Sequence, residues 1–285
     1  MRTATPILRA DRAPGIGPRY RISATPLSGW SKGRRKLGES GARHAQGGCN
    51  RLVVRERPAL IITADDYGYR RAYDRGILAA AGAGAVDAVS VMVTREGIDP
   101  VPLLETGVEI GLHLELPGDI VRGRRAGPRE RDVAVMSLAE QRERFGALFG
   151  RPPAYLDGHH HCHAHPGLGA AMAREAGRLA LPTRSVSALH RRLLRRVGVP
   201  TQDLLVGRLT EEAAEALPPE LRPAVEDGCE PPPGVTEWMV HPGYADPDAG
   251  SRYDRAREED LDLLLSLSLQ PALAPIRLTH VAALC

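Results

Sequence analysis

Residues 59–68 read ALIITADDYG, an apolar run with β-branched side chains that stops at two adjacent carboxylates. A short apolar run of this kind, bounded by polar residues, predicts a buried strand that ends in a loop. Residues 71–83 then carry Ala and Leu at helical spacing, and residues 86–94 are again apolar and β-branched. This order predicts a β-α-β unit, and therefore parallel strands.

The same alternation continues along the chain. We predict further strands at 108–116, 154–159, 183–187, 237–240 and 276–280, and further helices at 138–149, 168–178 and 251–267. Such alternation is typical of a single α/β domain, built either as a (β/α) barrel or as an open doubly wound sheet. The pattern alone leaves both architectures open.

The composition is that of an ordinary globular protein. Of the 285 residues, 26% are charged and 42% hydrophobic, so the chain can bury a substantial core. No apolar run approaches the ~20 residues of a membrane-spanning helix, so no membrane span is predicted. Only 4% of residues are aromatic and the net charge is +3, which disfavours a nucleic-acid partner. A homodimer is compatible with the sequence.

The four cysteines give no sign of a cysteine-built site. Cys49, Cys162, Cys229 and Cys285 are scattered without any C-x-x-C pair. This spacing argues against both a cysteine zinc site and a dense disulfide framework. The cytoplasm is therefore the expected compartment.

Residues 1–55 are predicted to be a disordered basic N-terminal extension, and residues 56–285 the single folded domain. The first 51 residues are rich in Arg, Gly, Pro and Ser, with almost no acidic residues and no sustained apolar period. They also lack the apolar core of a secretory signal. A tail that binds an acidic partner, an organelle-targeting segment and residues upstream of the true translation start all remain open. We favour the last of these, or a tail without function.

His113 lies in a predicted strand whose two faces differ in character. Successive side chains of a strand point to opposite faces, so Gly111, His113 and Glu115 share one face and three leucines share the other. A His and a Glu on the inner face need a metal or a hydrogen-bond network. His113 taken alone is more often a satisfied core histidine.

A histidine tract follows the predicted strand at 154–159. If the chain stays extended, Asp157, His159, His161 and His163 lie on one side and His160 on the other. Histidines gathered at a strand end favour metal binding. The alternative is a solvated tract that binds metal only adventitiously.

The pair Asp65 and Asp66 also closes a strand. Adjacent carboxylates in apolar surroundings repel each other unless a cation or a shared proton compensates. One carboxylate can bind a divalent metal while its neighbour takes a proton from metal-bound water. Taken alone, the pair before a glycine is more often a turn or a helix cap.

His241 stands at a fourth strand end, in the stretch EWMVHPGY at 237–244. An imidazole that titrates near neutral pH suits proton donation to a leaving amine, so His241 is a candidate general acid. A lone His before Pro would more often be structural.

Together these segments resemble the YdjC-like carbohydrate deacetylases, a family that includes chitooligosaccharide deacetylase and a hopanoid-associated branch. The motifs, in order, are TADDYG at 63–68, GLHL at 111–114, LDGHHHCH at 156–163 and HPGY at 241–244. A weaker family feature, a tyrosine before an Arg-rich acidic helix, is present at Tyr253, Arg257, Glu258 and Leu261. The resemblance runs from about Leu60 to the C-terminus.

The resemblance implies a fold, a cofactor and an activity. It implies a distorted (β/α) TIM-like barrel with a divalent metal ion, Mg or Zn, held by Asp66, His113 and His159. Asp65 then resembles the catalytic base, and His241 a residue of the same pocket. Metal-bound water would attack the acetamide of an N-acetylated amino sugar, such as a chitooligosaccharide, and release acetate.

Two alternatives use the same residue types. A metal-dependent phosphoesterase usually needs two or three metals, and no Gly-rich phosphate cradle follows a strand here. A non-catalytic metal-binding protein is the second alternative. Asp65 discriminates against it, because a pure binding site has no use for a second carboxylate beside the ligand.

Overall fold

The computed structural model describes residues 58–123, 125–207, 234–249 and 253–267, all of which belong to the compact unit Arg51–Cys285. The predicted N-terminal extension and the predicted strand at 276–280 lie outside these residues. The proposed division of the chain at residue 55 therefore stays a prediction.

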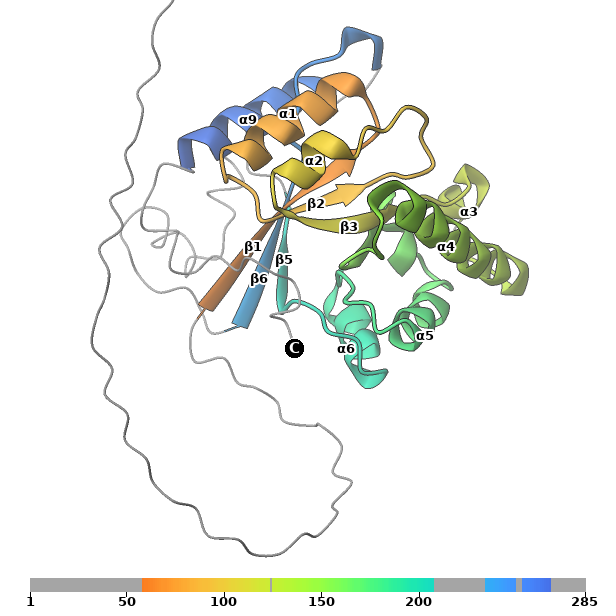
Figure 1. The fold of residues 1–285 in the computed structure, drawn as a ribbon. Helices are drawn as coiled ribbons and strands as arrows, with labels where there is room; N and C mark the ends of the chain where they lie inside the picture. Colours follow the sequence, from red (N-terminus) through yellow and green to blue (C-terminus); the bar gives the residue numbers. More distant parts are fainter. Residues whose placement is uncertain (1–57, 124, 208–233, 250–252, 268–285) are drawn as a thin grey trace, which may run out of the picture. The chain divides into compact units, whose positions relative to one another are not determined.

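The described strands form one parallel sheet. Its order is β4-β3-β2-β1-β6-β5, so β1 lies between β2 and β6 (Figure 1). The strands are β1 (Pro58–Tyr67), β2 (Ala88–Val91), β3 (Glu109–Leu114), β4 (Leu156–Gly158), β5 (Leu204–Val206) and β6 (Gly234–Val240). The α/β class and the parallel sheet are confirmed. Because all strands run the same way, their carboxyl ends meet at one edge of the sheet.

Helices connect the strands. They are α1 (Arg71–Gly82), α2 (Val101–Glu105), α3 (Gly118–Arg122), α4 (Pro128–Phe149), α5 (Gly169–Arg178), α6 (Ala188–Arg196) and α9 (Asp254–Leu267), with the 3₁₀ helices η1 (His159–Ala164) and η2 (Pro247–Ala249). Helices α1 and α9 lie side by side, while α4 contacts β3 and α5, and α5 contacts α6 (Figure 1).

The alternation of side chains along β1 separates two apolar clusters. Leu60, Ile62 and Ala64 belong to the larger cluster, which also contains buried side chains of α1, α4, α5 and α9. Ala59 and Ile61 belong to a smaller cluster that includes side chains of β2 and β6. Asp65 follows Ala59 and Ile61 at the period of two, so it points to the second face of the sheet.

Two predicted elements differ from the structure. The predicted strand at 183–187 is wrong, because this segment makes only one isolated bridge, between Thr183 and Leu156. The Gln202 side chain accepts a hydrogen bond from the backbone N–H of Ser185 and donates one to its backbone C=O. Neither group is therefore available to pair with a neighbouring strand. The helix predicted at 138–149 begins at Pro128 instead, where proline suits the first helical turn.

Candidate active site

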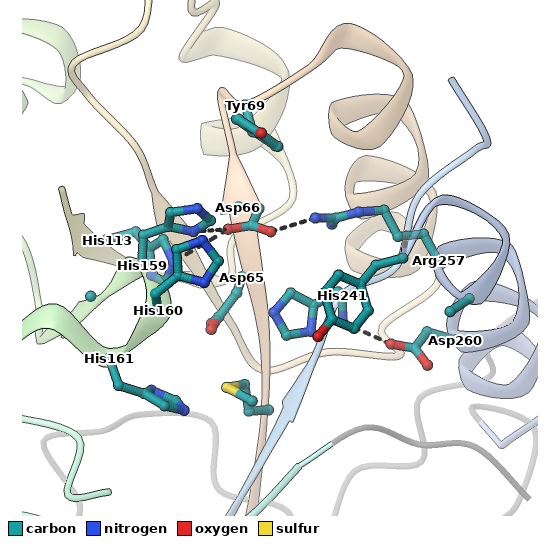
Figure 2. A pocket seen from close by; sticks show the side chains of 14 residues that line it. Asp65, Asp66, Tyr69, His113, His159, His160, His161, His241, Arg257 and Asp260 are labelled. Atoms are coloured by element: carbon teal, nitrogen blue, oxygen red, sulfur yellow. Dashed lines mark hydrogen bonds and ion pairs between the residues drawn. The ribbon is translucent and has the colours of Figure 1, made fainter. Parts of the chain in front are cut away.

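A cavity of about 410 Å³ lies at the carboxyl ends of the strands (Figure 2). This volume is within the usual range of small-molecule sites. All five residues singled out in the sequence line it, namely Asp65, Asp66, His113, His159 and His241. The structure therefore brings together side chains from strands β1 and β3, from the 3₁₀ helix η1 and from the residue that follows β6.

A β-bulge in β1 allows the side chains of both Asp65 and Asp66 to face this cavity. The register of β1 against β2 shifts between Ala64 and Tyr67, and Asp66 has a φ of 75°. Neighbouring residues of a regular strand point to opposite faces, but the extra residue of a bulge re-aims a side chain. A left-handed backbone costs a non-glycine residue about 1–3 kcal/mol, and such residues cluster at functional sites.

Asp66, His113 and His159 form a group of metal-ligand type. Asp66 Oδ1 lies 3.3 Å from His113 Nε2 and 3.0 Å from His159 Nδ1. The three atoms lie within 4.8 Å of one another. One carboxylate and two imidazoles are a ligand set that zinc and other divalent metals accept, with a further position left for water or substrate. The donor set thus fits the metal that the resemblance implies.

The orientation of His113 supports the same conclusion. Its Nδ1 lies 2.7 Å from Asp157 Oδ1, and Ser90 Oγ donates to Asp157 Oδ2 at 2.6 Å. A metal-binding histidine commonly donates a hydrogen bond from its other ring nitrogen to a carboxylate in this way. Burial by itself would lower the pKa of His113, but Asp157 and Asp65 outweigh it and raise the pKa well above its usual value. These surroundings therefore favour positive charge.

Asp65 has a different partner. Arg184 donates to both of its oxygens, at 2.7 and 2.8 Å, and also reaches Asp157 Oδ2 at 2.9 Å and Glu237 Oε1 at 2.9 Å. Burial alone would raise the pKa of Asp65, but Arg184 and His113 outweigh it, so this pKa lies below its usual value. Asp65 therefore stays ionised, with lone pairs left for one further hydrogen bond.

Arg184 also bears on a second group of metal-ligand type. Asp65, His113 and Asp157 have ligand atoms within 4.8 Å of one another, and all three are buried. Arg184 already forms ion pairs with both carboxylates in this group. Within the described part of the chain, the geometry thus favours one cation, between Asp66, His113 and His159.

His241 reaches the cavity from a loop that β6 and α9 hold in place. Its backbone N–H donates to Asp260 Oδ2 at 3.0 Å, and the N–H of Gly243 donates to the carbonyl of Arg257 at 3.1 Å. Burial lowers the pKa of the His241 ring, although Asp66 and Asp65 oppose this shift. The ring is therefore neutral at pH 7 and can exchange a proton with a bound molecule.

The predicted extended histidine tract is wrong. Residues His159–Ala164 form η1, and His160 and His161 have left-handed φ values of 51° and 56°. The turn separates the side chains, so His163 is buried with its Nε2 at 2.9 Å from the carbonyl oxygen of Arg184. Cys162 Sγ donates a hydrogen bond to the carbonyl oxygen of Leu114 at 3.1 Å, which links this turn to β3.

Glu115 does not share the site with His113 as the alternation predicted. Strand β3 ends at Leu114, and the Glu115 carboxylate pairs with Arg95 and Thr94 instead. Its side chain thus joins the segment after β2 to the end of β3.

Sequence reasoning gave no role to four residues of this site, Asp157, Arg184, Arg257 and Asp260. The cavity is also lined by Ala256, Arg257 and Asp260 on α9 and by Tyr253, which directly precedes this helix. Their offsets from Tyr253, three, four and seven residues, are those of one helical face. That spacing is visible in the sequence. Arg184 carried no such signal, because its segment was predicted as a strand.

Comparison with known proteins gives consistent results. A family model described as YdjC-like protein matches residues 59–274. A chitooligosaccharide deacetylase from Serratia marcescens is 30% identical over 75% of this chain and 94% of its own length. A carbohydrate deacetylase from Geobacillus stearothermophilus is also 30% identical, over 75% of this chain and 92% of its own length.

A solved structure is similar in fold. It is a candidate cellobiose-phosphate cleavage protein from Enterococcus faecalis V583, with 23% identity and a TM-score of 0.62. The match covers 80% of this chain and 99% of that one. Among the described helices of the present protein, none has the length and apolar character needed to cross a membrane.

Proposed function

The chain belongs to the YdjC-like protein family, and on that premise we propose that it is a carbohydrate N-deacetylase that uses one divalent metal ion. Its substrate would be an N-acetylated amino sugar, alone or in a chitooligosaccharide. The observation that carries the proposal is the group of Asp66, His113 and His159, which lies in a cavity beside a second carboxylate, Asp65.

The residues of the cavity divide the work of amide hydrolysis. A divalent ion at Asp66, His113 and His159 would supply Lewis-acid activation of water and of the acetamide oxygen. Asp65, which Arg184 keeps ionised and oriented, would take a proton from the attacking water. The neutral ring of His241 would take up this proton in turn and give it to the nitrogen of the leaving amine. Water and acetamide thus become acetate and a free amino sugar.

The two alternative functions have less support. A two-metal phosphoesterase would need Asp65 or Asp157 as ligands of a second ion, but Arg184 contacts both oxygens of Asp65 and Oδ2 of Asp157. A binding protein without catalysis would leave Asp65 only its ion pair with Arg184, although this carboxylate lines the cavity beside the three ligands. The barrel form of the sheet, the choice of Mg or Zn, a homodimer and the cytoplasm remain predictions from the sequence.

A mass-spectrometric screen tests the proposed function. The full chain, loaded with Zn²⁺ or Mg²⁺, would be incubated with N-acetylated mono-, di- and oligosaccharides and with N-acetylated glycolipid head groups. We expect the loss of one acetyl group from at least one class, suppression by a chelator and recovery with added metal. No acetate from any substrate would overturn the proposal, and full activity in metal-free protein would overturn its metal step.

A further inference from the structure

Arg257 contacts the oxygen of Asp66 that the histidines do not use. Its Nη2 lies 2.5 Å from Asp66 Oδ2, while Asp66 Oδ1 faces His113 and His159 (Figure 2). The two oxygens of one carboxylate are thus divided between an arginine from α9 and two histidines from the other side.

An aromatic ring fixes the guanidinium group in this position. The Cζ atom of Arg257 lies 3.9 Å from the centroid of the Tyr73 ring on α1. The hydroxyl of Tyr73 donates to Asp254 Oδ1 at 3.0 Å, and Asp254 stands one turn before Arg257 on α9. A cation stacked on an aromatic face is stabilised by the ring and loses freedom to rotate. The guanidinium group of Arg257 is therefore held by the ring of Tyr73 against its face and by Asp66 Oδ2 at Nη2.

Arg257 could either contact the substrate directly or act by positioning Asp66. Its burial distinguishes between these two roles. The residue is only 4% exposed, and its Nε and Nη1 are buried with no hydrogen-bond partner in the described structure. These two nitrogens are therefore closed to a ligand in the cavity, and the third, Nη2, already donates to Asp66 Oδ2. Each unsatisfied buried donor also costs about 1–3 kcal/mol. An arginine kept purely for stability would be expected to satisfy these donors.

We infer that Arg257 is a positioning residue that holds Asp66 Oδ2 and so presents Oδ1 alone to the metal ion. This inference rests on the metal site of the proposed function. With one oxygen held back, Asp66, His113 and His159 supply three ligand atoms and leave a position open for water and substrate. Without Arg257, the Asp66 carboxylate could turn and offer both oxygens or neither.

Metal binding by purified full-length variants tests the inference without any substrate. Arg257→Met removes the charge and the donor at similar length, and Arg257→Lys keeps the charge but loses the planar group that stacks on Tyr73. Arg255→Met is the matched control, because Arg255 lies on the same helix with a 92% exposed side chain. Zn²⁺ affinity would be measured by competition with a chromogenic chelator, and ligand geometry by the visible spectrum of the Co²⁺-substituted protein.

We expect Arg257→Met and Arg257→Lys to weaken Zn²⁺ binding by roughly 10–100-fold and to alter the Co²⁺ spectrum. Arg255→Met should match the wild type in both measurements. Should Arg257→Met fail to fold, Arg257→Lys decides the matter. If zinc affinity and the cobalt spectrum are unchanged in the folded variant, only this inference is overturned. If the wild type binds neither Zn²⁺ nor Mg²⁺, the metal step of the proposed function fails and the inference fails with it.

Discussion

Asp65 and Asp66 show how one bulge gives different surroundings to two identical side chains. Asp65 pairs with Arg184 through both oxygens, whereas Asp66 faces two histidines and Arg257. The two side chains are chemically identical, so their chemistry alone does not explain why their partners differ. The difference comes from the backbone of β1, which turns left-handed at Asp66.

Substitution of the two aspartates should separate metal binding from catalysis. We expect Asp66→Asn, His113→Ala and His159→Ala to reduce metal content, because each removes one of three ligands. Asp65→Asn should keep the metal and lose activity by roughly 10²–10⁴-fold, as expected when a general base is removed. Metal analysis beside kcat measures both effects. An empty site in Asp65→Asn beside a loaded Asp66→Asn would show that the two roles are exchanged.

Removal of Arg184 should strongly destabilise the fold. Arg184→Met would leave Asp65 and Asp157 buried without their cation, and breaking a buried ion pair costs about 3–5 kcal/mol. The measurement is the free energy of unfolding in urea. Arg178→Met on α5 is the control, because that arginine is 67% exposed in its pair with Glu175 and should matter little. Equal effects of the two substitutions would contradict the expectation.

The site residues that could be predicted from the sequence are those that belong to short motifs. Asp65, Asp66, His113, His159 and His241 each follow or end a strand, and the geometry of parallel strands gathers them. Arg184 and Arg257 reach the site through tertiary contacts, 119 residues from Asp65 and 191 residues from Asp66. Local pattern can mark the helical face that carries Arg257, but it does not show which distant residue each arginine pairs with.

Among the elements, helix α1 and the loop at 241–244 approach each other unusually closely. A Cβ atom on Gly76 would lie 2.4 Å from the Cα atom of Gly243, a distance that forces one backbone to move. The loop is also bonded to α1 by the N–H of Tyr244, which donates to the carbonyl of Ala72 at 3.2 Å. The position of His241 therefore depends on a glycine in a helix.

We predict that Gly76→Ala lowers both stability and activity. The added methyl group should destabilise the protein by about 1–3 kcal/mol, as overpacking does, and displace the loop that carries His241. Gly82→Ala at the end of the same helix is the control, because nothing lies within 4 Å of its Cβ position. That change should be neutral or stabilising by up to about 1 kcal/mol. Thermal unfolding and kcat test both variants, and a Gly76→Ala enzyme that matches Gly82→Ala would refute the prediction.

The elements that sequence predicted best are those with a clear apolar period. Helix α1 and strand β3 lie where the pattern placed them, because burial of one face or both determines each. The segments at 159–164 and 183–187 were predicted wrongly, since contacts distant in sequence shape them. Cys162 ties the first to β3, and Gln202 occupies the backbone of the second.

At the scale of the whole molecule, the site residues in the described part of the chain all follow Pro58, at which β1 begins. Removal of Met1–Arg51 should therefore leave the fold and the activity intact, because the site residues lie between Asp65 and Asp260 and the family match begins at residue 59. The melting temperature and kcat/KM of the truncated chain check this. Insolubility or loss of activity would show that the extension contributes to the domain.

The place of β1 in the sheet has a consequence for synthesis. Of the described strands β1 is synthesised first, yet it pairs along seven residues with β6, and Asp66 pairs with Arg257, which is 191 residues later in the chain. At 5–20 residues per second the ribosome needs roughly 10–40 s to cover that distance. During this time the apolar residues of β1 have no partner strand on one side, so nascent chains should engage chaperones until α9 has left the ribosome.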